Sequence, residues 1–136
     1  MGTMYKRYCK TLTLKNDNEL IREYKKVHGI GNGWPEIKQG MKEVGIIDME
    51  IYIRGNLLFM IMDTVEDFDH VKAMNELAKK PRQQEWETFV SKFQNTDADA
   101  SADSKWQLME RIYELNQEKE YPAIDGQRKE LKISGK

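Results

Sequence analysis

The sequence holds a single cysteine, Cys9, and almost no net charge, because 22 lysines and arginines stand against 23 acidic residues in 136. One cysteine excludes an internal disulfide and favours a reducing compartment. A formal net charge of -1 provides no field that would attract nucleic acid or an anionic membrane. No apolar run reaches the length of a membrane span or of a signal peptide's apolar segment. We therefore expect a cytoplasmic protein with neither nucleic-acid nor membrane partners.

Signatures of bound metals and nucleotides are also missing. Gly29, Gly31 and Gly33 do not form a phosphate-binding motif, and they follow a predicted helix rather than a strand. Residues 97–108 have the spacing of a calcium loop, but Ala102 replaces its turn glycine. No serine or cysteine nucleophile has a neighbouring base, and there is no redox pair. We expect neither a metal nor a cofactor.

The sequence does contain enough apolar residues for one packed domain, since 39% of its residues are hydrophobic. The β-forming residues over 5–14 predict a first strand. An apolar stripe over 20–28 has helical spacing and predicts a helix that ends at His28, before the three glycines. Pro35 suits the first turn of a second helix, which we expect to end at Gly45.

The middle of the chain has the pattern of a β-hairpin. Two apolar runs, 46–53 and 57–62, flank Arg54-Gly55-Asn56. The first run alternates apolar and polar side chains, so one of its faces should pack against helices. Thr64 and Asp67 resemble a capping box that would open a third helix.

The last third of the chain predicts one more helix and one more strand. An apolar stripe that begins at Trp86 predicts a fourth helix. We expect a loop over 94–104 and a last strand over 106–115. The charged tail, 116–136, is expected to form an exposed arm with no core of its own.

This order of elements, β-α-α-β-β-α-α-β, predicts an α+β fold. It is an elaborated ferredoxin-like pattern, with a four-stranded antiparallel sheet that carries helices on one face only. The domain should span 1–115, followed by the charged C-terminal arm 116–136. Stacking two such sheets would bury the uncovered faces, so we expect a two-fold symmetric homodimer.

Of the two histidines, His28 is the better candidate for a catalytic residue. It lies one helical turn after Tyr24 and just before the glycine-rich break that leads into Trp34-Pro35-Glu36. An imidazole with a reference pKa of about 6.5 can accept and donate a proton at neutral pH, and Tyr and Trp can shape a cavity beside it. A capping or packing role is the alternative. His70, among acidic residues at a helix start, is predicted to be a solvated surface residue.

Trp86 with Glu85 is the second candidate site. An indole face offers a flat apolar platform for the C–H face of a sugar, and a neighbouring carboxylate can accept hydroxyl protons. Burial of Trp86 in the core is the alternative, because it begins an apolar helical stripe.

Several segments in the same order resemble the L-rhamnose mutarotase family, from about Tyr5 to Leu115. They are Glu23-Tyr24 with His28, Trp34-Pro35-Glu36, Gly45 with the strand that ends at Tyr52, Asn56-Leu57-Leu58-Phe59, and Trp86. Three further segments are similar to a branch of that family that acts on L-fucose. They are Asp48-Met49-Glu50-Ile51-Tyr52, Pro81-Arg82-Gln83-Gln84-Glu85-Trp86 and Trp106-Gln107-Leu108-Met109-Glu110-Arg111.

The resemblance implies a dimeric ferredoxin-like α/β barrel and a mutarotase acting on a 6-deoxy-L-hexose monosaccharide. It implies a catalytic histidine at His28 and sugar contacts at Tyr24, Met49, Glu85 and Trp86. Relatives that act on rhamnose carry Tyr where this chain has Met49, and a second Trp where it has Glu85. The hydroxyl contacts must therefore differ, which leaves L-rhamnose and L-fucose both open as substrates.

The residues suit this chemistry, because mutarotation needs one proton delivered to the ring oxygen and another removed from the anomeric hydroxyl. We expect His28 to be the main acid/base, with Tyr24, Glu36 or Glu50 carrying the second proton. Trp34 would help to shape the cavity. A dimeric ferredoxin-like monooxygenase and a non-catalytic sugar-binding module are the alternatives, since fold alone does not separate them.

Overall fold

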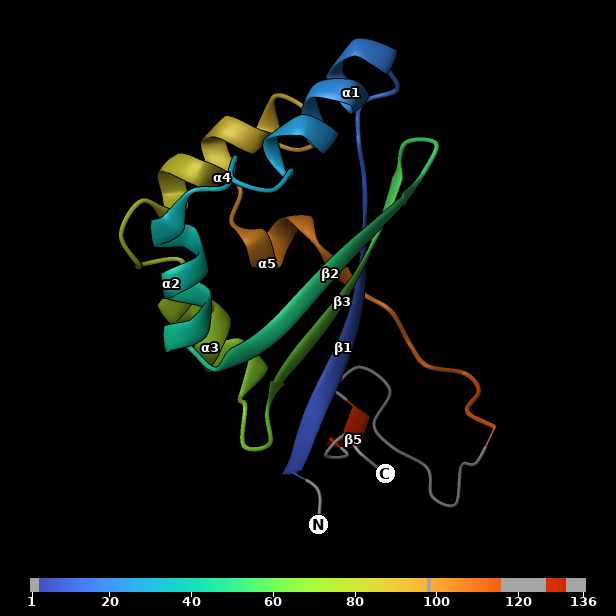
Figure 1. Ribbon diagram of the computed structural model, residues 1–136, viewed down its shortest axis with the longest axis vertical. Helices are drawn as coiled ribbons and strands as arrows, with labels where there is room; N and C mark the ends of the chain where they lie inside the picture. Colours follow the sequence, from blue (N-terminus) through green and yellow to red (C-terminus); the bar gives the residue numbers. More distant parts are fainter. Residues whose placement is uncertain (1–2, 98, 116–126, 132–136) are drawn as a thin grey trace.

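The structure is a computed structural model that describes residues 3–97, 99–115 and 127–131. Its elements are β1 (Thr3–Thr13), α1 (Asn18–Val27), α2 (Pro35–Glu43), β2 (Ile46–Arg54), β3 (Leu57–Val65), α3 (His70–Leu77), α4 (Gln83–Ser91), α5 (Ala102–Lys105), β4 (Gln107–Leu108) and β5 (Gln127–Leu131). The labelled helices all lie on one side of the sheet (Figure 1). Within the described ranges, no helix combines the length and apolar character needed to cross a bilayer.

The sheet is antiparallel, with the strand order β2-β3-β1-β4. Strand β4 pairs with Lys10 and Thr11, and β5 pairs with Thr3 to Arg7, so both lie along the edge of β1 that faces away from β3. This arrangement confirms the predicted α+β fold, a ferredoxin-like sheet with helices on one face.

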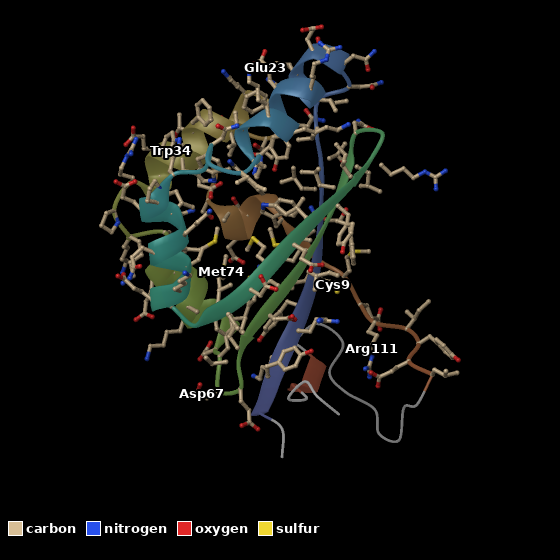
Figure 2. All side chains as sticks on the ribbon, in the orientation of Figure 1. Cys9, Glu23, Trp34, Asp67, Met74 and Arg111 are labelled. Carbon is tan, nitrogen blue, oxygen red and sulfur yellow. The ribbon has the colours of Figure 1, made fainter. Side chains whose placement is uncertain are left out.

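Alternation along the two central strands places the core between the sheet and the helices. Tyr8 and Leu12 of β1 and Met60 and Met62 of β3 are buried on the helical face. They pack against buried side chains from the helices and loops, which include Tyr24, Phe68, Met74, Leu77, Val90, Phe93 and Trp106. In Figure 2, Trp34 and Met74 lie on the helical side of the sheet and Arg111 lies on the other side. Candidate site residues on this face of the sheet therefore lie between the strands and the helices.

The hairpin predicted around Arg54-Gly55-Asn56 is confirmed. Strands β2 and β3 pair from Arg54 opposite Leu57 onward, and Gly55 adopts a φ of 61° that suits the tight turn. Near its start, β2 carries a bulge between Ile46 and Asp48. From Met49 onward β2 alternates, with Met49 half-buried and Glu50 exposed.

The last strand, predicted over 106–115, is much shorter than expected. Residues 102–105 form the short helix α5, and the regular strand that follows, β4, covers only Gln107 and Leu108. The Ser101 hydroxyl caps this helix by accepting a hydrogen bond from the Ser104 N–H, and the Trp106 N–H donates to the Ala102 carbonyl. A capped turn therefore forms where the sequence favoured a loop, and it takes Trp106 out of the strand.

The capping box at Thr64 is also wrong. Thr64 belongs to β3 and is fully buried against the helices, so its hydroxyl does not start a helix. Helix α3 begins later, where the Asp69 carboxylate accepts a hydrogen bond from the Lys72 N–H at 3.2 Å. The apolar alternation of β3 extends the strand past the residue that resembled a cap.

The charged arm contains one described element. Its residues 127–131 form β5 beside the first half of β1. Residues 116–126 and 132–136 of the arm lie outside the described residues.

Candidate functional site

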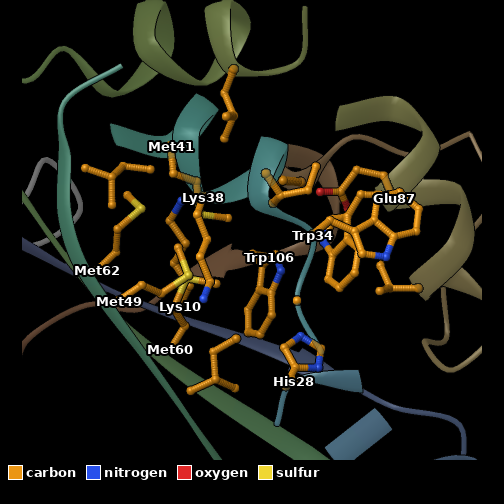
Figure 3. Close-up of a pocket in the computed structure, with 18 of the residues that line it drawn as sticks. Lys10, His28, Trp34, Lys38, Met41, Met49, Met60, Met62, Glu87 and Trp106 are labelled. Carbon is orange, nitrogen blue, oxygen red and sulfur yellow. The ribbon is translucent and has the colours of Figure 1, made fainter. Parts of the chain in front are cut away.

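A cavity of about 470 Å³ lies between the helices and the sheet. Helices α1, α2 and α4 contribute aromatic, apolar and charged side chains, and strands β1, β2 and β3 contribute apolar ones together with Lys10 and Asp48. The lining includes Lys10, Tyr24, His28, Trp34, Lys38, Met41, Met49, Met60, Met62, Trp86, Glu87, Gln94 and Trp106. Figure 3 shows two sides: methionines with Lys10 and Lys38 on one, and Trp34, Trp106 and His28 on the other. We call these the methionine-rich side and the aromatic side.

His28 ends helix α1 and presents its ring to the cavity. Its Nδ1 atom lies 2.9 Å from the carbonyl oxygen of Tyr24. Because a carbonyl only accepts, Nδ1 carries the proton in the neutral ring and Nε2 is left as a proton acceptor. Part of the residue is open to solvent, yet the ring centroid is 4.3 Å from that of Tyr24 and 5.7 Å from that of Trp86. The site therefore holds a base of defined tautomer beside two aromatic rings.

Burial sets the protonation states of this pair. Burial lowers the pKa of His28 below its ordinary value, and the hydrogen bond to the Tyr24 carbonyl opposes this only partly. Burial raises the pKa of Tyr24 well above its usual range, although a hydrogen bond from Gln94 acts the other way. At neutral pH the site therefore contains a neutral imidazole and a neutral phenol.

Trp34 and Trp86 form the aromatic wall of the cavity. Trp34 immediately precedes Pro35 at the start of α2, and Trp86 lies in the first turn of α4; their ring centroids are 5.1 Å apart. The Arg82 guanidinium stacks 4.2 Å from the Trp34 ring. Such an apolar wall can hold the C–H face of a sugar.

Arg82 also engages both predicted carboxylates of this region. It pairs with Glu85 at 3.1 Å and with Glu36 at 3.3 Å. Arg82 is the only non-glycine residue with a positive φ, 65°, in the described part of the chain. Neither carboxylate lines the cavity, since both lie around the guanidinium on the exposed side of the aromatic wall.

The alternation of β2 separates Met49 from Glu50. Met49 lines the cavity, whereas Glu50 lies on the opposite face, where it accepts a hydrogen bond from the Tyr52 hydroxyl at 2.7 Å. The structure therefore brings together five predicted site residues, Tyr24, His28, Trp34, Met49 and Trp86, at one cavity. It does not bring Glu36, Glu50 or Glu85 there.

His70 is not the solvated residue that its acidic neighbours predicted. Its side chain is only 10% exposed, and its ring centroid lies 5.0 Å from that of Tyr8. As the first residue of α3 it turns toward β1, and Asp103 lies 4.0 Å from its Nδ1. His70 does not line the cavity.

A buried ion pair that the sequence analysis missed borders the cavity. Glu87 of α4 accepts from Lys105 Nζ at 2.9 Å and from Gln83 Nε2 at 2.7 Å. The side chains of Lys105 and Glu87 are 0% and 6% exposed. Gln83, Glu87 and Val90 share one face of α4, and this pattern could have indicated that Glu87 is buried. Lys105 lay between the expected loop, 94–104, and the expected strand, 106–115, so nothing in the sequence indicated its burial.

Lys10 is the second missed residue. It is 1% exposed on the helical face of β1, between Tyr8 and Leu12. Burial lowers the pKa of Lys10 to about 8, and the nearby Asp103 carboxylate opposes this shift. The signal was the alternation of the first strand, which put a lysine on an apolar face. Among the described residues, no three His, Cys, Asp or Glu side chains gather as a metal site would require.

Comparison with known proteins decides the family. The model of the L-rhamnose mutarotase family matches residues 7–115. This chain belongs to the L-rhamnose mutarotase family. The resemblance inferred from the sequence is thereby confirmed.

Members and neighbours of the mutarotase family cover most of the chain. It is 32% identical to an L-fucose mutarotase of Xanthomonas campestris pv. campestris over 111 residues, 82% of this chain and 89% of the relative. It is 34% identical to a UPF0734 protein of Dictyostelium discoideum over 116 residues, 82% of this chain and 91% of that protein. The crystal structure of an L-rhamnose mutarotase from Formosa agariphila shares the fold. Its TM-score is 0.60 at 20% identity, over 80% of this chain and 97% of that one.

Proposed function

We propose that this protein is an aldose mutarotase that interconverts the α and β anomers of a 6-deoxy-L-hexose, L-rhamnose or L-fucose, without a cofactor. Family membership supports the reaction, and the relatives' activities support the sugar class. The observation that carries the proposal is the His28 imidazole at the wall of the cavity. Its Nδ1 bonds the Tyr24 carbonyl, and its Nε2, which has no hydrogen-bond partner among the described residues, can accept a proton. We infer a cytoplasmic location, which a sequence with a single cysteine favours.

Anomer exchange needs two proton transfers and leaves the protein unchanged. His28 accepts the proton of the anomeric hydroxyl while the bond between C1 and the ring oxygen breaks and the ring oxygen receives a proton from a second group. The open-chain aldehyde turns its other face to the hydroxyl and recloses, and the reverse transfers restore both groups. Of the expected second carriers Tyr24, Glu36 and Glu50, only Tyr24 lines the cavity.

The two sides of the cavity suit a 6-deoxy sugar. Met49 and the Trp86 ring offer apolar surface to the C6 methyl and to the C–H face of the ring. Tyr24 and Gln94 offer polar atoms to the hydroxyls. A fully hydroxylated hexose would place its C6 hydroxyl against apolar side chains, which is unfavourable without a partner.

The test is the exchange rate between anomers, measured by saturation-transfer NMR on L-rhamnose, L-fucose, D-ribose and D-galactose. We expect acceleration above the spontaneous rate for at least one 6-deoxy-L-hexose, and much less for the other two sugars. Absence of acceleration with every sugar contradicts the proposal. Tight binding without acceleration would identify a binding module, and oxygen consumption with a quinol or haem would identify a monooxygenase.

The proposal includes a homodimer formed through the sheet face that the helices leave uncovered (Figure 1). By the alternation of β3, Phe59 and Ile61 lie on this face, and the Tyr52 ring centroid lies 6.5 Å from that of Phe59. Tyr52 is 55% exposed in the single chain. Stacking of a second sheet would bury this apolar surface.

Analytical ultracentrifugation tests the dimer. We expect a dimer for the wild type and a monomer for Ile61→Arg, because the substitution places a charge at the stacked faces. Val71→Arg is the matched control, since Val71 is 69% exposed on α3, in the helical layer. A monomeric wild type at micromolar concentration contradicts this part of the proposal.

A further inference from the structure

We propose that Lys10 is a catalytic residue that contacts the ring oxygen of the bound sugar and supplies the second proton of the anomer exchange. This inference rests on the proposed mutarotase function. Lys10 projects from the middle of β1 on the face that carries Tyr8 and Leu12, and it lines the same cavity as His28. Figure 3 shows Lys10 on the methionine-rich side and His28 on the aromatic side. A sugar held between these sides has one proton carrier on each.

Lys10 is buried without a hydrogen-bond acceptor from the described residues. It is 1% exposed, and its neighbours on the same strand face are apolar. A buried charge without a partner costs free energy that an apolar side chain in the same place would avoid. An oxygen atom of a sugar in the cavity would supply the missing acceptor.

The other charged groups around the cavity are less suited to deliver this proton. The Glu87 carboxylate already accepts from Lys105 and Gln83. The Asp48 carboxylate accepts from the Met49 N–H, and Lys38 and Lys42 are exposed on α2. Asp103 of α5 acts on Lys10 by favouring its charged form.

The acidity of Lys10 fits the role. Burial lowers its pKa to about 8, so the side chain is charged at neutral pH and yet gives up its proton more readily than an ordinary lysine. Burial moves the pKa of the Tyr24 hydroxyl in the opposite direction, which makes it the weaker acid. Tyr24 is therefore better suited to orient the sugar than to protonate it.

The step balances with these two residues alone. The bond between C1 and the ring oxygen breaks, the ring oxygen takes a proton from the Lys10 ammonium, and His28 takes the proton of the anomeric hydroxyl. The products are an open-chain aldehyde, a neutral amine and an imidazolium. Reclosure on the other face returns one proton to each residue.

The experiment compares the kcat and KM of anomer exchange for the wild type, Lys10→Met and Lys10→Arg. Methionine fits a buried site and has no proton to give, whereas arginine keeps the charge but does not release its proton. We expect both variants to lose about 10²-fold or more in kcat, with KM changed only a few-fold. Lys79→Met, an exposed position outside the cavity, is the control.

The pH profile gives a second readout. Above pH 8 the wild-type kcat/KM should fall as Lys10 loses its proton, with an apparent pKa near 8; in Lys10→Met this alkaline limb should be absent. An active wild type with unchanged kcat in Lys10→Met, or full rescue by Lys10→Arg, overturns the role of Lys10 and leaves the mutarotase proposal intact. A wild type that accelerates no sugar's exchange overturns the proposed function itself. A thermal melt of each variant shows that it is folded.

Discussion

The Nδ1 atom of His28 and the carbonyl oxygen of Tyr24 are 2.9 Å apart, one helical turn from each other. Tyr24 therefore fixes the imidazole through its backbone while its ring packs against the same imidazole. Because the end of a helix leaves its last carbonyls without intrahelical donors, this bond satisfies one of them as well. The same contact thus completes the helix and selects the tautomer.

Replacing His28 by Gln should abolish most of the catalysis. The amide keeps much of the volume and can donate to the Tyr24 carbonyl, but it does not accept a proton, so we expect anomer exchange to slow by about 10²–10⁴-fold. Saturation-transfer NMR measures the rate, and circular dichroism checks the fold. Lys25→Gln, on the exposed side of α1, should retain the wild-type rate. A wild-type rate in the His28 variant would remove this residue from the mechanism.

On the acidic side of neutrality, kcat/KM should stay near its maximum down to a lower pH than a histidine of ordinary pKa would allow. Because burial lowers the pKa of His28 below 6.5, the imidazole is still mostly neutral at pH 6.5, and the acid limb of kcat/KM should have its midpoint below that pH. A profile from pH 4.5 to 7.5 measures it. A midpoint at or above 6.5 would contradict a lowered pKa of His28.

Breaking the buried Glu87–Lys105 pair should cost stability. Glu87→Gln leaves the Lys105 ammonium, whose side chain is 0% exposed, without its counter-ion, and we expect a loss of about 3 kcal/mol in the free energy of unfolding. Urea unfolding measures the loss. Glu19→Gln removes one partner of an exposed pair with Arg22 and should leave the midpoint unchanged. Equal urea midpoints for both variants would show that burial of an ion pair does not determine how much stability is lost when one partner is removed.

Lys10 should make stability rise with pH on the alkaline side. Its folded pKa of about 8 lies below the unfolded value of 10.5, so between these values the unfolded chain binds more protons and the free energy of unfolding increases with pH. The difference between the folded and the unfolded pKa of Lys10 corresponds to a loss of about 3 kcal/mol in the free energy of unfolding below pH 8. Lys10→Met should therefore be the more stable protein at pH 7, and its advantage should shrink toward pH 10. A constant difference between the two proteins across this range would contradict the buried charge.

Met49→Tyr should change sugar preference rather than the chemistry. The residue lines the methionine-rich side, and a phenol there adds a hydrogen-bonding group of the kind that rhamnose-acting relatives carry. We expect the ratio of kcat/KM for L-rhamnose to that for L-fucose to rise about 10-fold or more. Competition between the two sugars in one NMR sample gives the ratio directly.

Local patterns predicted most of the fold. The alternation of β2, the helical stripe that ends at His28 and the Trp86 stripe each depend on neighbours within a few residues, and all three elements formed. Helix α5 was missed because its four residues, Ala-Asp-Ser-Lys, carry no apolar stripe. Its consequence, the burial of Lys105 against Glu87, depends on residues 18 positions apart.

The candidate site was predicted only in part, because local patterns indicate single residues but not which residues the fold brings together. His28 and Trp86 were predicted from residue chemistry and helical spacing. Glu85 was expected because it adjoins Trp86 and because the resemblance implied it, and Glu36 and Glu50 were expected because a carboxylate can carry a proton. Adjacent residues on a strand point to opposite faces, and adjacent residues on a helix differ by about 100° in direction. Lys10, on the other hand, lay on the apolar face of a correctly predicted strand, where a charge is the informative exception.

Arg82 links helix α2, which Trp34 precedes, to helix α4, which contains Trp86. Its guanidinium stacks on Trp34 and pairs with Glu36 of α2 and Glu85 of α4, while its own backbone occupies a conformation that glycine prefers. Glycine at this position would remove the backbone strain, but it would also remove the stacking on Trp34 and both ion pairs. Glycine, the residue that suits the backbone best at this position, would therefore leave α2 and α4 free to move relative to each other and would loosen the aromatic wall between them.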